Sequence, residues 1–227
     1  MIKHSDKENN PFEFQYRTDE NGTIENVNID NIREFGIGNI LKYQRHKINI
    51  DRSPVDIRYL SNNSKPEFRL ETLFLQILIE GSVNLYSYKD GNLRRFFFKE
   101  EDSDIKPLIY KKYRIGPKKV SQNVNYKQEL YLSLNCTGLD RSRFEKLGYD
   151  RSSLVSLFKK YYECMGKDYN DFSEKYSKSQ LNIYIRSGLN FNTFSMASPE
   201  TGGETIHLED QTNLRFGLEF EWILPIK

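Results

Sequence analysis

Long apolar runs are missing from this sequence of 227 residues. No stretch approaches the ~20 consecutive apolar residues that an α-helix needs to cross the hydrocarbon core of a bilayer. The first residues, MIKHSDKENNPFEF, also lack the apolar core of a secretory signal peptide. If Met1 is the natural start of the chain, these two absences predict a cytoplasmic location.

Motifs that identify common enzyme classes are also missing. The chain has no G-x-x-x-x-G-K-[ST] phosphate loop, so we expect no bound nucleotide, and it has no G-x-S-x-G nucleophile elbow. Its three histidines, His4, His46 and His207, stand far apart without the spacing of metal ligands. We therefore predict a non-enzymatic protein with no catalytic residues, no metal and no cofactor.

Neither sign of charge is in excess. The chain has 34 Lys and Arg against 32 Asp and Glu, which gives a net charge of +2. Nucleic-acid-binding domains usually carry a clear basic excess, so no nucleic acid partner is expected. Short basic clusters, such as Arg94-Arg95 and Lys118-Lys119, are interpreted as solvated surface.

Alternating apolar residues and aromatic residues are abundant instead, with 15 Phe and 15 Tyr in the chain. The clearest alternation lies within residues 70–99. One side of this stretch carries Leu73, Leu75, Ile77 and Ile79, and the other carries Phe74, Gln76, Leu78 and Glu80. A period of two indicates strands, and Asp90-Gly91 is typical of a type I′ hairpin turn. We predict an antiparallel hairpin at the centre of a sheet.

Shorter alternating segments on both sides extend this predicted sheet over the first 115 residues. They are residues 12–16, 23–29, 32–37, 43–50 and 105–115.

After residue 115 the apolar residues recur with the period of an α-helix. This period predicts helices over Tyr126–Leu134 and Ser152–Met165, with Ser152 or Ser153 as the N-cap of the second helix and Gly166 at its end. The second helix is expected to bury Leu154, Phe158, Tyr161, Tyr162 and Met165. The polar residues 167–179 are predicted to form a linker.

The two cysteines follow these helices. Cys136 lies just after the first predicted helix and Cys164 near the end of the second, so a helical hairpin would bring this candidate disulfide pair together. Two buried free thiols are the alternative, and they are what a cytosolic protein would have. The spacing alone does not decide between them.

The C-terminal segments 180–194 and 212–224 alternate for longer than a typical soluble strand of five or six residues. Their length matches the ~10-residue alternating segments of transmembrane β-barrels. The candidate lipid-facing residues are Leu214, Phe216, Leu218, Phe220, Trp222 and Leu224. A half-buried hairpin of a soluble sheet is the alternative interpretation.

These patterns together predict an α+β fold with three parts. Residues 1–166 form an antiparallel β-sheet N-terminal domain with a helical pair, residues 167–179 a polar linker, and residues 180–227 an amphipathic β-hairpin, for which the alternation leaves both the outer-membrane-barrel type and the soluble type open.

The order of these parts resembles a family of Bacteroidota proteins. The similarity lies in Asn10-Pro11-Phe12-Glu13-Phe14, Glu34-Phe35-Gly36, Lys42-Tyr43, Ile50-Asp51-Arg52-Ser53, Glu71-Thr72-Leu73-Phe74-Leu75, Ile79-Glu80-Gly81, Leu85-Tyr86 and Gly91-Asn92-Leu93-Arg94-Arg95-Phe96-Phe97. Members are predicted to carry a signal peptide, a β-rich N-terminal domain, a helical pair with two cysteines and an outer-membrane β-barrel. The similarity covers residues 12–165.

The resemblance implies a periplasmic N-terminal domain with an oxidised Cys136–Cys164 pair, in a protein located in the cell envelope. It also implies that this chain is a fragment without the signal peptide and most of the barrel, so that residues 180–227 would be its first two strands. The expected function is that of the non-enzymatic N-terminal portion of an outer-membrane β-barrel protein, with the outer membrane as partner and a role in envelope organisation, binding or transport. The alternative is a self-contained soluble binding module whose terminal hairpin completes the same sheet.

Overall fold

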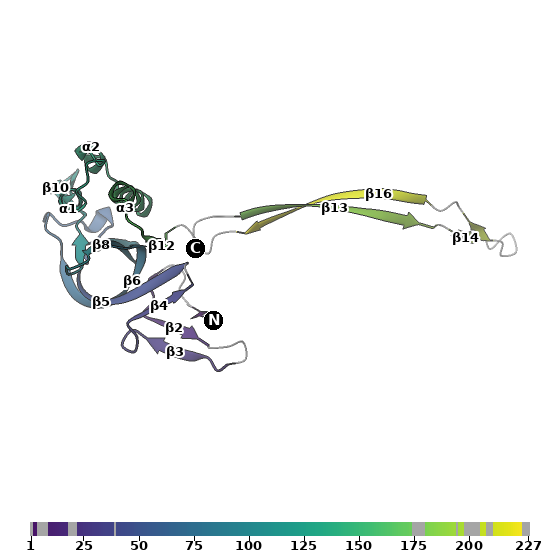
Figure 1. The fold of residues 1–227 in the computed structure, drawn as a ribbon, viewed down its shortest axis with the longest axis horizontal. Coiled ribbons are helices and arrows are strands. Elements are labelled where there is room, and N and C mark those ends of the chain that lie inside the picture. The colour runs from purple at the N-terminus through teal and green to yellow at the C-terminus, as the bar shows by residue number, and fades with distance from the viewer. Residues whose placement is uncertain are drawn as a thin grey trace. The chain divides into compact units, whose positions relative to one another are not determined.

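The computed structural model describes residues 2–3, 9–17, 22–38, 40–173, 180–193, 195–197, 205–207 and 211–223, which fall into two compact units (Figure 1). The N-terminal unit comprises residues 1–177 with 226–227, and the C-terminal unit comprises Lys178–Pro225. The described elements are mainly antiparallel strands with three short α-helices, so the prediction of a β-rich α+β fold is confirmed at this level.

The strands of the N-terminal unit are β1 (Ile2–Lys3), β2 (Glu13–Tyr16), β3 (Glu25–Asn28), β4 (Glu34–Ile37), β5 (Leu41–Asp51), β6 (Phe68–Glu80), β7 (Val83–Asp90), β8 (Leu93–Glu100), β9 (Lys106–Leu108), β10 (Lys111–Gly116), β11 (Lys119–Asn123) and β12 (Asn170–Asp171). Its helices are the short 3-10 helix η1 (Ile57–Tyr59), α1 (Asn125–Ser133), α2 (Arg141–Glu145) and α3 (Arg151–Met165). The C-terminal unit contains β13 (Gln180–Asn192), β14 (Ser195–Ala197), β15 (Thr205–His207) and β16 (Gln211–Ile223).

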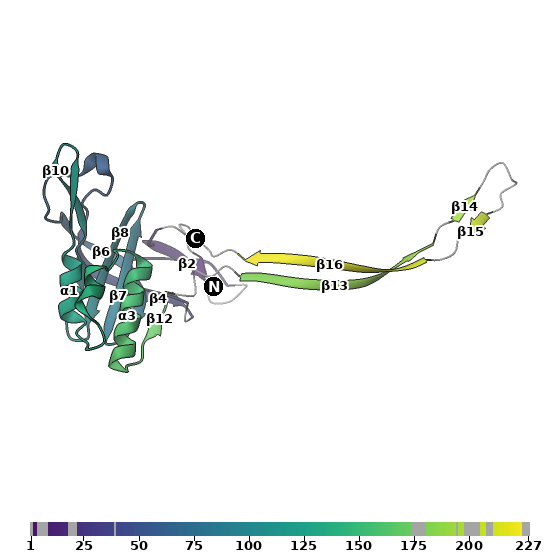
Figure 2. The ribbon, with the colours of Figure 1, turned by 90° about the horizontal axis from the view of Figure 1, so that it is seen from above.

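A seven-stranded antiparallel sheet organises the N-terminal unit. Its order is β4-β5-β6-β7-β8-β9, and β12 pairs with the end of β6. The sheet is curved, and α1 and α3 cover one of its faces (Figures 1 and 2). Strands β1-β2-β3 and β10-β11 form two smaller sheets. No helix in the described part of the chain is both long and apolar enough to span a bilayer.

Both faces of the central sheet are buried, which explains why its strands are so rich in large apolar residues. Leu85 pairs with Phe98, and both pack in the core beneath the helices. The next pair, Tyr86 and Phe97, belongs to the core on the other face, together with Ile50. Successive strand residues point to opposite faces, so the alternation in the sequence divides these residues between two cores.

A β-bulge in β6 changes the predicted alternation. Leu73, Leu75 and Ile77 share one core as expected, but the pairing register with β7 shifts between Ile77 and Ile79. Ile79 consequently pairs with Leu85 and packs beneath the helices. The extra residue of a bulge moves the following side chains to the opposite face, so the prediction for Ile79 is wrong.

The turn between β7 and β8 also differs from the prediction. Asp90 is still paired, with Leu93, so the two loop residues are Gly91 and Asn92. Gly91 has φ of 56°, whereas Asn92 has no positive φ. A type I′ turn needs positive φ at both central residues, and a type II′ turn needs glycine only at the first. The turn therefore meets the requirement of type II′.

Helix α3 begins at a different cap from the one predicted. Asp150 is the N-cap, because its carboxylate accepts a hydrogen bond from the backbone N–H of Ser153 at 2.9 Å. The hydroxyls of Ser152 and Ser153 donate to the same carboxylate instead of capping the helix themselves. Gly166 ends the helix with φ of 61°, as expected. Met165 is 40% exposed and does not join the buried face.

Part of the predicted linker belongs to the central sheet. Asn170 and Asp171 pair with Glu80 and Ile79, and the backbone N–H of the buried Phe172 donates to the carbonyl of Leu78 at 3.0 Å. The prediction of a linker is therefore wrong for these three residues. Residues 174–179 lie outside the described part of the chain.

The stretch predicted as one strand over residues 105–115 forms two. Strand β9 pairs with β8 in the central sheet, and β10 pairs with β11 in a separate hairpin. Neither β11 nor α2 was expected from the sequence.

Candidate functional site

The C-terminal unit contains an amphipathic ribbon of strands β13 and β16. The two strands pair without a register break, from Gln180 with Ile223 to Asn192 with Gln211. Directly paired residues lie on the same face of an antiparallel pair. The apolar rows of the two strands therefore coincide, and the shared apolar face consists of Ile183, Ile185, Leu189, Phe191, Leu214, Phe216, Leu218 and Phe220.

The apolar face of the ribbon is solvent-exposed. Its eight large apolar side chains have exposed fractions between 57% and 77%. Contiguous exposed apolar surface of this kind is rare on soluble monomers and marks a surface that contacts another molecule or lipid. Four of the six candidate lipid-facing residues lie here, namely Leu214, Phe216, Leu218 and Phe220. Trp222 pairs with Leu181 in the backbone register, its side chain lies outside the described part, and Leu224 lies outside it entirely.

The opposite face of the ribbon is polar and internally bonded. The side chains of Asn182 and Tyr184 donate hydrogen bonds to the carboxylate of Glu221, at 3.0 Å and 3.1 Å respectively. These two bonds hold the pKa of Glu221 below its ordinary value. Arg186 forms an ion pair with Glu219 across the strands. The two faces of one ribbon thus offer opposite chemistry.

Cys136 and Cys164 form a disulfide in the N-terminal unit. Their Cα atoms are 6.5 Å apart, and the bond joins the segment after α1 to the last turn of α3. The backbone N–H of Gly138 lies 3.3 Å from the sulfur of Cys164. Of the two states that the sequence left open, the structure has the bonded one.

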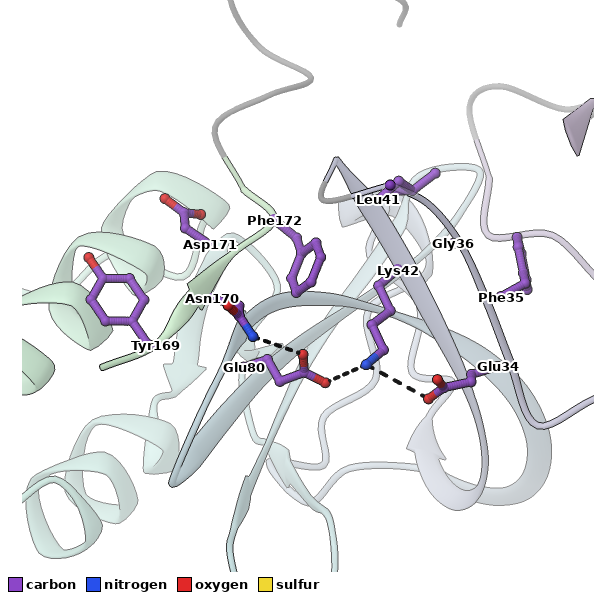
Figure 3. Close-up of a pocket in the computed structure, with 11 residues that line it drawn as sticks. Glu34, Phe35, Gly36, Leu41, Lys42, Glu80, Tyr169, Asn170, Asp171 and Phe172 are labelled. Carbon is purple, nitrogen blue, oxygen red and sulfur yellow. Dashed lines mark hydrogen bonds and ion pairs between the residues drawn. The ribbon is translucent and has the colours of Figure 1, made fainter. Parts of the chain in front are cut away.

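A cavity of about 580 Å³ opens between β4, the start of β5 and β12 (Figure 3). Its central polar group is the ammonium of Lys42, which lies 2.7 Å from a carboxylate oxygen of Glu80 and 3.9 Å from one of Glu34. The side-chain amide of Asn170 lies 3.5 Å from the other oxygen of Glu80. These four residues come from four strands, which the curved sheet brings together.

The remaining charged group of the cavity is also paired. A carboxylate oxygen of Asp171 lies 2.7 Å from the ammonium of Lys159, and the other accepts hydrogen bonds from Ser173. Burial alone would raise the pKa of Asp171, but the bonds from Lys159 and Ser173 outweigh it and lower the pKa. The residues described as lining the cavity include no serine, threonine, cysteine or histidine. The cavity therefore offers charged and polar groups that can bind a ligand.

A second polar cluster is buried inside the N-terminal unit. Arg95, which is only 5% exposed, lies 3.0 Å from a carboxylate oxygen of Asp51 and also donates to the backbone carbonyls of Asp51 and Ser53. The interpretation of Arg94-Arg95 as a solvated cluster is therefore wrong for Arg95. Every partner in this cluster belongs to the fold, so its role is to fix the loop after β5 against β8.

A metal centre has no support within the described ranges. No three His, Cys, Asp or Glu residues there lie close enough together to hold an ion. His46 is partly buried beside Tyr86, and its pKa is lowered, first by burial and then by the charge of Lys99. His4 lies outside the described residues, and of His207 only the backbone is described.

The comparisons with known proteins add no family or function: no protein-family model, no curated protein and no solved structure matches this chain.

Proposed function

We propose that the protein is a non-enzymatic component of the cell envelope whose ribbon contacts lipid. In this proposal β13 and β16 are neighbouring strands of outer-membrane-barrel type, and the N-terminal unit is a periplasmic-type domain for organisation, binding or transport. The observation that carries the proposal is the coincidence of the two exposed apolar rows on one face of the ribbon.

The dimensions of the ribbon fit this proposal. Each strand has 13 residues, which exceeds the roughly 9–11 residues that a tilted strand needs to cross a bilayer. In a membrane barrel the apolar face meets lipid and the polar face lines the interior. The bonded network around Glu219 and Glu221 would occupy that interior face.

The open edges of the ribbon limit what it does alone. Within the described part of the chain, β13 and β16 pair only with each other. Unpaired backbone groups are costly in hydrocarbon, so crossing a bilayer requires further strands at both edges. We therefore expect this chain by itself to bind at the membrane interface rather than to cross the membrane.

The disulfide supports the proposed location. Disulfides persist in oxidising compartments, which include the bacterial periplasm, and they are rare in the cytosol. Cys164 is exposed and therefore open to cellular reductants.

Vesicle binding tests the ribbon. The whole chain is mixed with vesicles of uncharged phosphatidylcholine, and binding is followed by co-flotation and by the emission of Trp222, the single tryptophan. Phe216→Arg should weaken binding by about 10- to 150-fold, since it removes an aromatic contact worth roughly 1.5–3 kcal/mol.

The matched control is Gly217→Arg, which places the same charge on the opposite face. A Cβ atom at Gly217 would meet no heavy atom within 4 Å, so the ribbon accommodates this change. Equal loss of binding in both variants, or no binding by the unmodified chain, would contradict the proposal.

The cavity favours a second candidate function, that of a soluble binding module. Lys42 between Glu34 and Glu80 presents both signs of charge, which suits a small zwitterion such as an amino acid. The ribbon is a separate two-stranded sheet, however, and does not extend the central sheet as this alternative expects. A thermal-shift screen of free amino acids against the unmodified chain and Lys42→Met would test it. Stabilisation of the unmodified chain alone supports this candidate, and no stabilisation contradicts it.

A further inference from the structure

A lobe at one end of the N-terminal unit combines two segments that are distant in sequence. We call residues 54–66 and 112–122 the basic lobe; the first segment contains η1, and the second contains most of the β10–β11 hairpin (Figure 2). The backbone N–H of Arg114 donates to the carbonyl of Ser61 at 2.9 Å, and its guanidinium donates to the carbonyl of Ile57 at 2.7 Å. These bonds hold the two segments together as one surface.

Two further hydrogen bonds fix the base of the basic lobe. The side-chain amide of Asn123 donates to the carbonyl of Ser64 at 3.0 Å. The buried ammonium of Lys111 donates to the carbonyl of Lys65 at 2.8 Å and pairs with Glu67 at 3.0 Å. The lobe is therefore a preformed surface and does not depend on a partner for its shape.

The charge of the basic lobe departs from the balance of the whole chain. Its basic side chains are Arg58, Lys65, Lys112, Arg114, Lys118 and Lys119. Its one carboxylate is Asp56, which Arg58 already neutralises at 2.6 Å. In the described structure Lys112, Lys118 and Lys119 form no ion pair. The lobe thus presents an uncompensated positive field of the kind that attracts anionic surfaces.

Apolar side chains are exposed among these cations. Ile57 and Tyr59 of η1 are 59% and 68% exposed, and Ile115 is 51% exposed. The register between β10 and β11 shifts between Arg114 and Gly116, so Ile115 is the extra residue of a bulge at the hairpin end. Val55 and Val120 add two smaller exposed apolar groups.

We infer that the basic lobe docks on the surface of an anionic lipid bilayer. Phosphate headgroups pair with the lysines, while the exposed Ile57, Tyr59 and Ile115 enter the boundary between headgroups and acyl chains. A nucleic acid would satisfy the positive charge but would offer nothing to the two isoleucines. The inference goes beyond the proposed function, because it rests on the N-terminal unit alone and does not require the ribbon to enter lipid.

Binding of the whole chain to two kinds of vesicle tests this inference. One kind contains phosphatidylcholine alone, and the other contains about one third phosphatidylglycerol. The double variant Lys118→Gln with Lys119→Gln should bind anionic vesicles roughly 30-fold more weakly, at about fivefold per lysine, and should bind uncharged vesicles unchanged. This difference should disappear near 1 M salt, where the Debye length is about 3 Å.

Matched controls distinguish an effect of the basic lobe from a general effect of positive charge or of exposed apolar surface. Lys146→Gln with Lys167→Gln removes the same charge from exposed positions outside the lobe and should leave binding unchanged. Ile115→Ser should weaken binding to anionic vesicles, whereas Leu132→Ser, at a side chain that is 69% exposed on α1, should not.

Three results would overturn the inference. They are equal effects of the lobe and control lysine pairs, no preference for anionic vesicles, and lobe-dependent binding of duplex DNA without vesicle binding. The ribbon proposal fails in a different way, by loss of binding to uncharged vesicles, so the two outcomes are distinguishable.

Discussion

The hydroxyl of Tyr162 forms two hydrogen bonds with the backbone of Val83. It accepts from the N–H of Val83 at 2.7 Å and donates to the carbonyl of the same residue at 2.8 Å. Tyr162 lies on α3 and Val83 begins β7, so this pair fastens the helical layer to the sheet. Both residues are buried; in the described structure β8 pairs with this end of β7, whereas the pairing with β6 stops at Leu85 and leaves the β6 side of Val83 to Tyr162.

Tyr162→Phe should therefore destabilise the N-terminal unit. The change leaves a buried backbone N–H and carbonyl without their partner, at a cost of about 1–3 kcal/mol. Denaturant unfolding followed by circular dichroism measures the difference. The control is Tyr161→Phe, because the adjacent hydroxyl has no hydrogen bond in the described structure. Equal destabilisation by both variants would contradict the role assigned to Tyr162.

Gly81→Ala should destabilise the same contact by overpacking. A Cβ atom at Gly81 would lie 2.6 Å from the hydroxyl oxygen of Tyr162 and 2.9 Å from its ring, and the expected cost is about 1–3 kcal/mol. At Gly116 a Cβ atom would meet nothing within 4 Å, so Gly116→Ala serves as the control.

The combination of the two changes sharpens this test. Because Tyr162→Phe removes the closest clashing atom, the double variant with Gly81→Ala should lose less stability than the sum of the single variants. Strict additivity would show that the two residues do not act through the same contact.

The buried ion pair predicts a specific dependence of stability on pH. Burial would raise the pKa of Asp51, but hydrogen bonds from Ser53 and the charge of Arg95 outweigh it and lower the pKa below 3.8. A carboxyl with a lowered pKa in the folded state stabilises the fold above its unfolded value, and this stabilisation is lost as the pH falls through the folded value. The contribution of Asp51 should therefore be complete at neutral pH and should decline below 3.8.

Asp51→Asn tests this dependence. At neutral pH it leaves the buried guanidinium of Arg95 without its counter-charge, which costs about 3–5 kcal/mol. The difference in unfolding midpoint between this variant and the unmodified chain should narrow as the pH falls from neutral to about 2. Asp102→Asn, at an exposed position, is the control and should produce no such convergence. A constant difference across this range would contradict the prediction.

The sequence predicts the architecture of the central sheet well but not its register. Alternation is a local property, so the two faces of β6 are readable up to Ile77. The bulge that turns Ile79 towards the helices depends on the pairing with β7 and has no local signal. The same limit applies to the N-cap of α3. Asp and Ser are both common N-cap residues, so the local sequence does not choose between Asp150 and the two serines at positions 152 and 153.

The candidate sites also differ in how far the sequence alone predicts them. The apolar face of the ribbon follows from strict alternation, and the structure adds only that the rows of β13 and β16 coincide. The cavity groups Lys42, Glu80 and Asn170 come from three strands, so no spacing in the sequence brings them together. From the sequence alone Arg95 resembles an exposed cation, and only the structure shows that Asp51 lies beside it.

The disulfide is expected to contribute directly to stability. It links residues separated by 28 positions, and the chain-entropy model gives about 3–4 kcal/mol for a loop of this size. Replacing both cysteines, Cys136→Ser with Cys164→Ser, should lower the unfolding free energy by this amount. Reduction of the unmodified chain should have a similar effect, and the double variant should be insensitive to reductant. Destabilisation of that variant by reductant would show that the effect does not arise from this bond.

The state of the same bond in the cell tests the proposed location. Free thiols are counted by mass spectrometry on protein taken from its native host, with and without reductant. An intact Cys136–Cys164 bond is expected in an oxidising envelope compartment, because cytosolic reductants keep thiols of this kind reduced. Two free thiols would contradict the envelope proposal. In that case, the apolar face of the ribbon would have to be covered by a protein partner, and the soluble binding module would become the better interpretation.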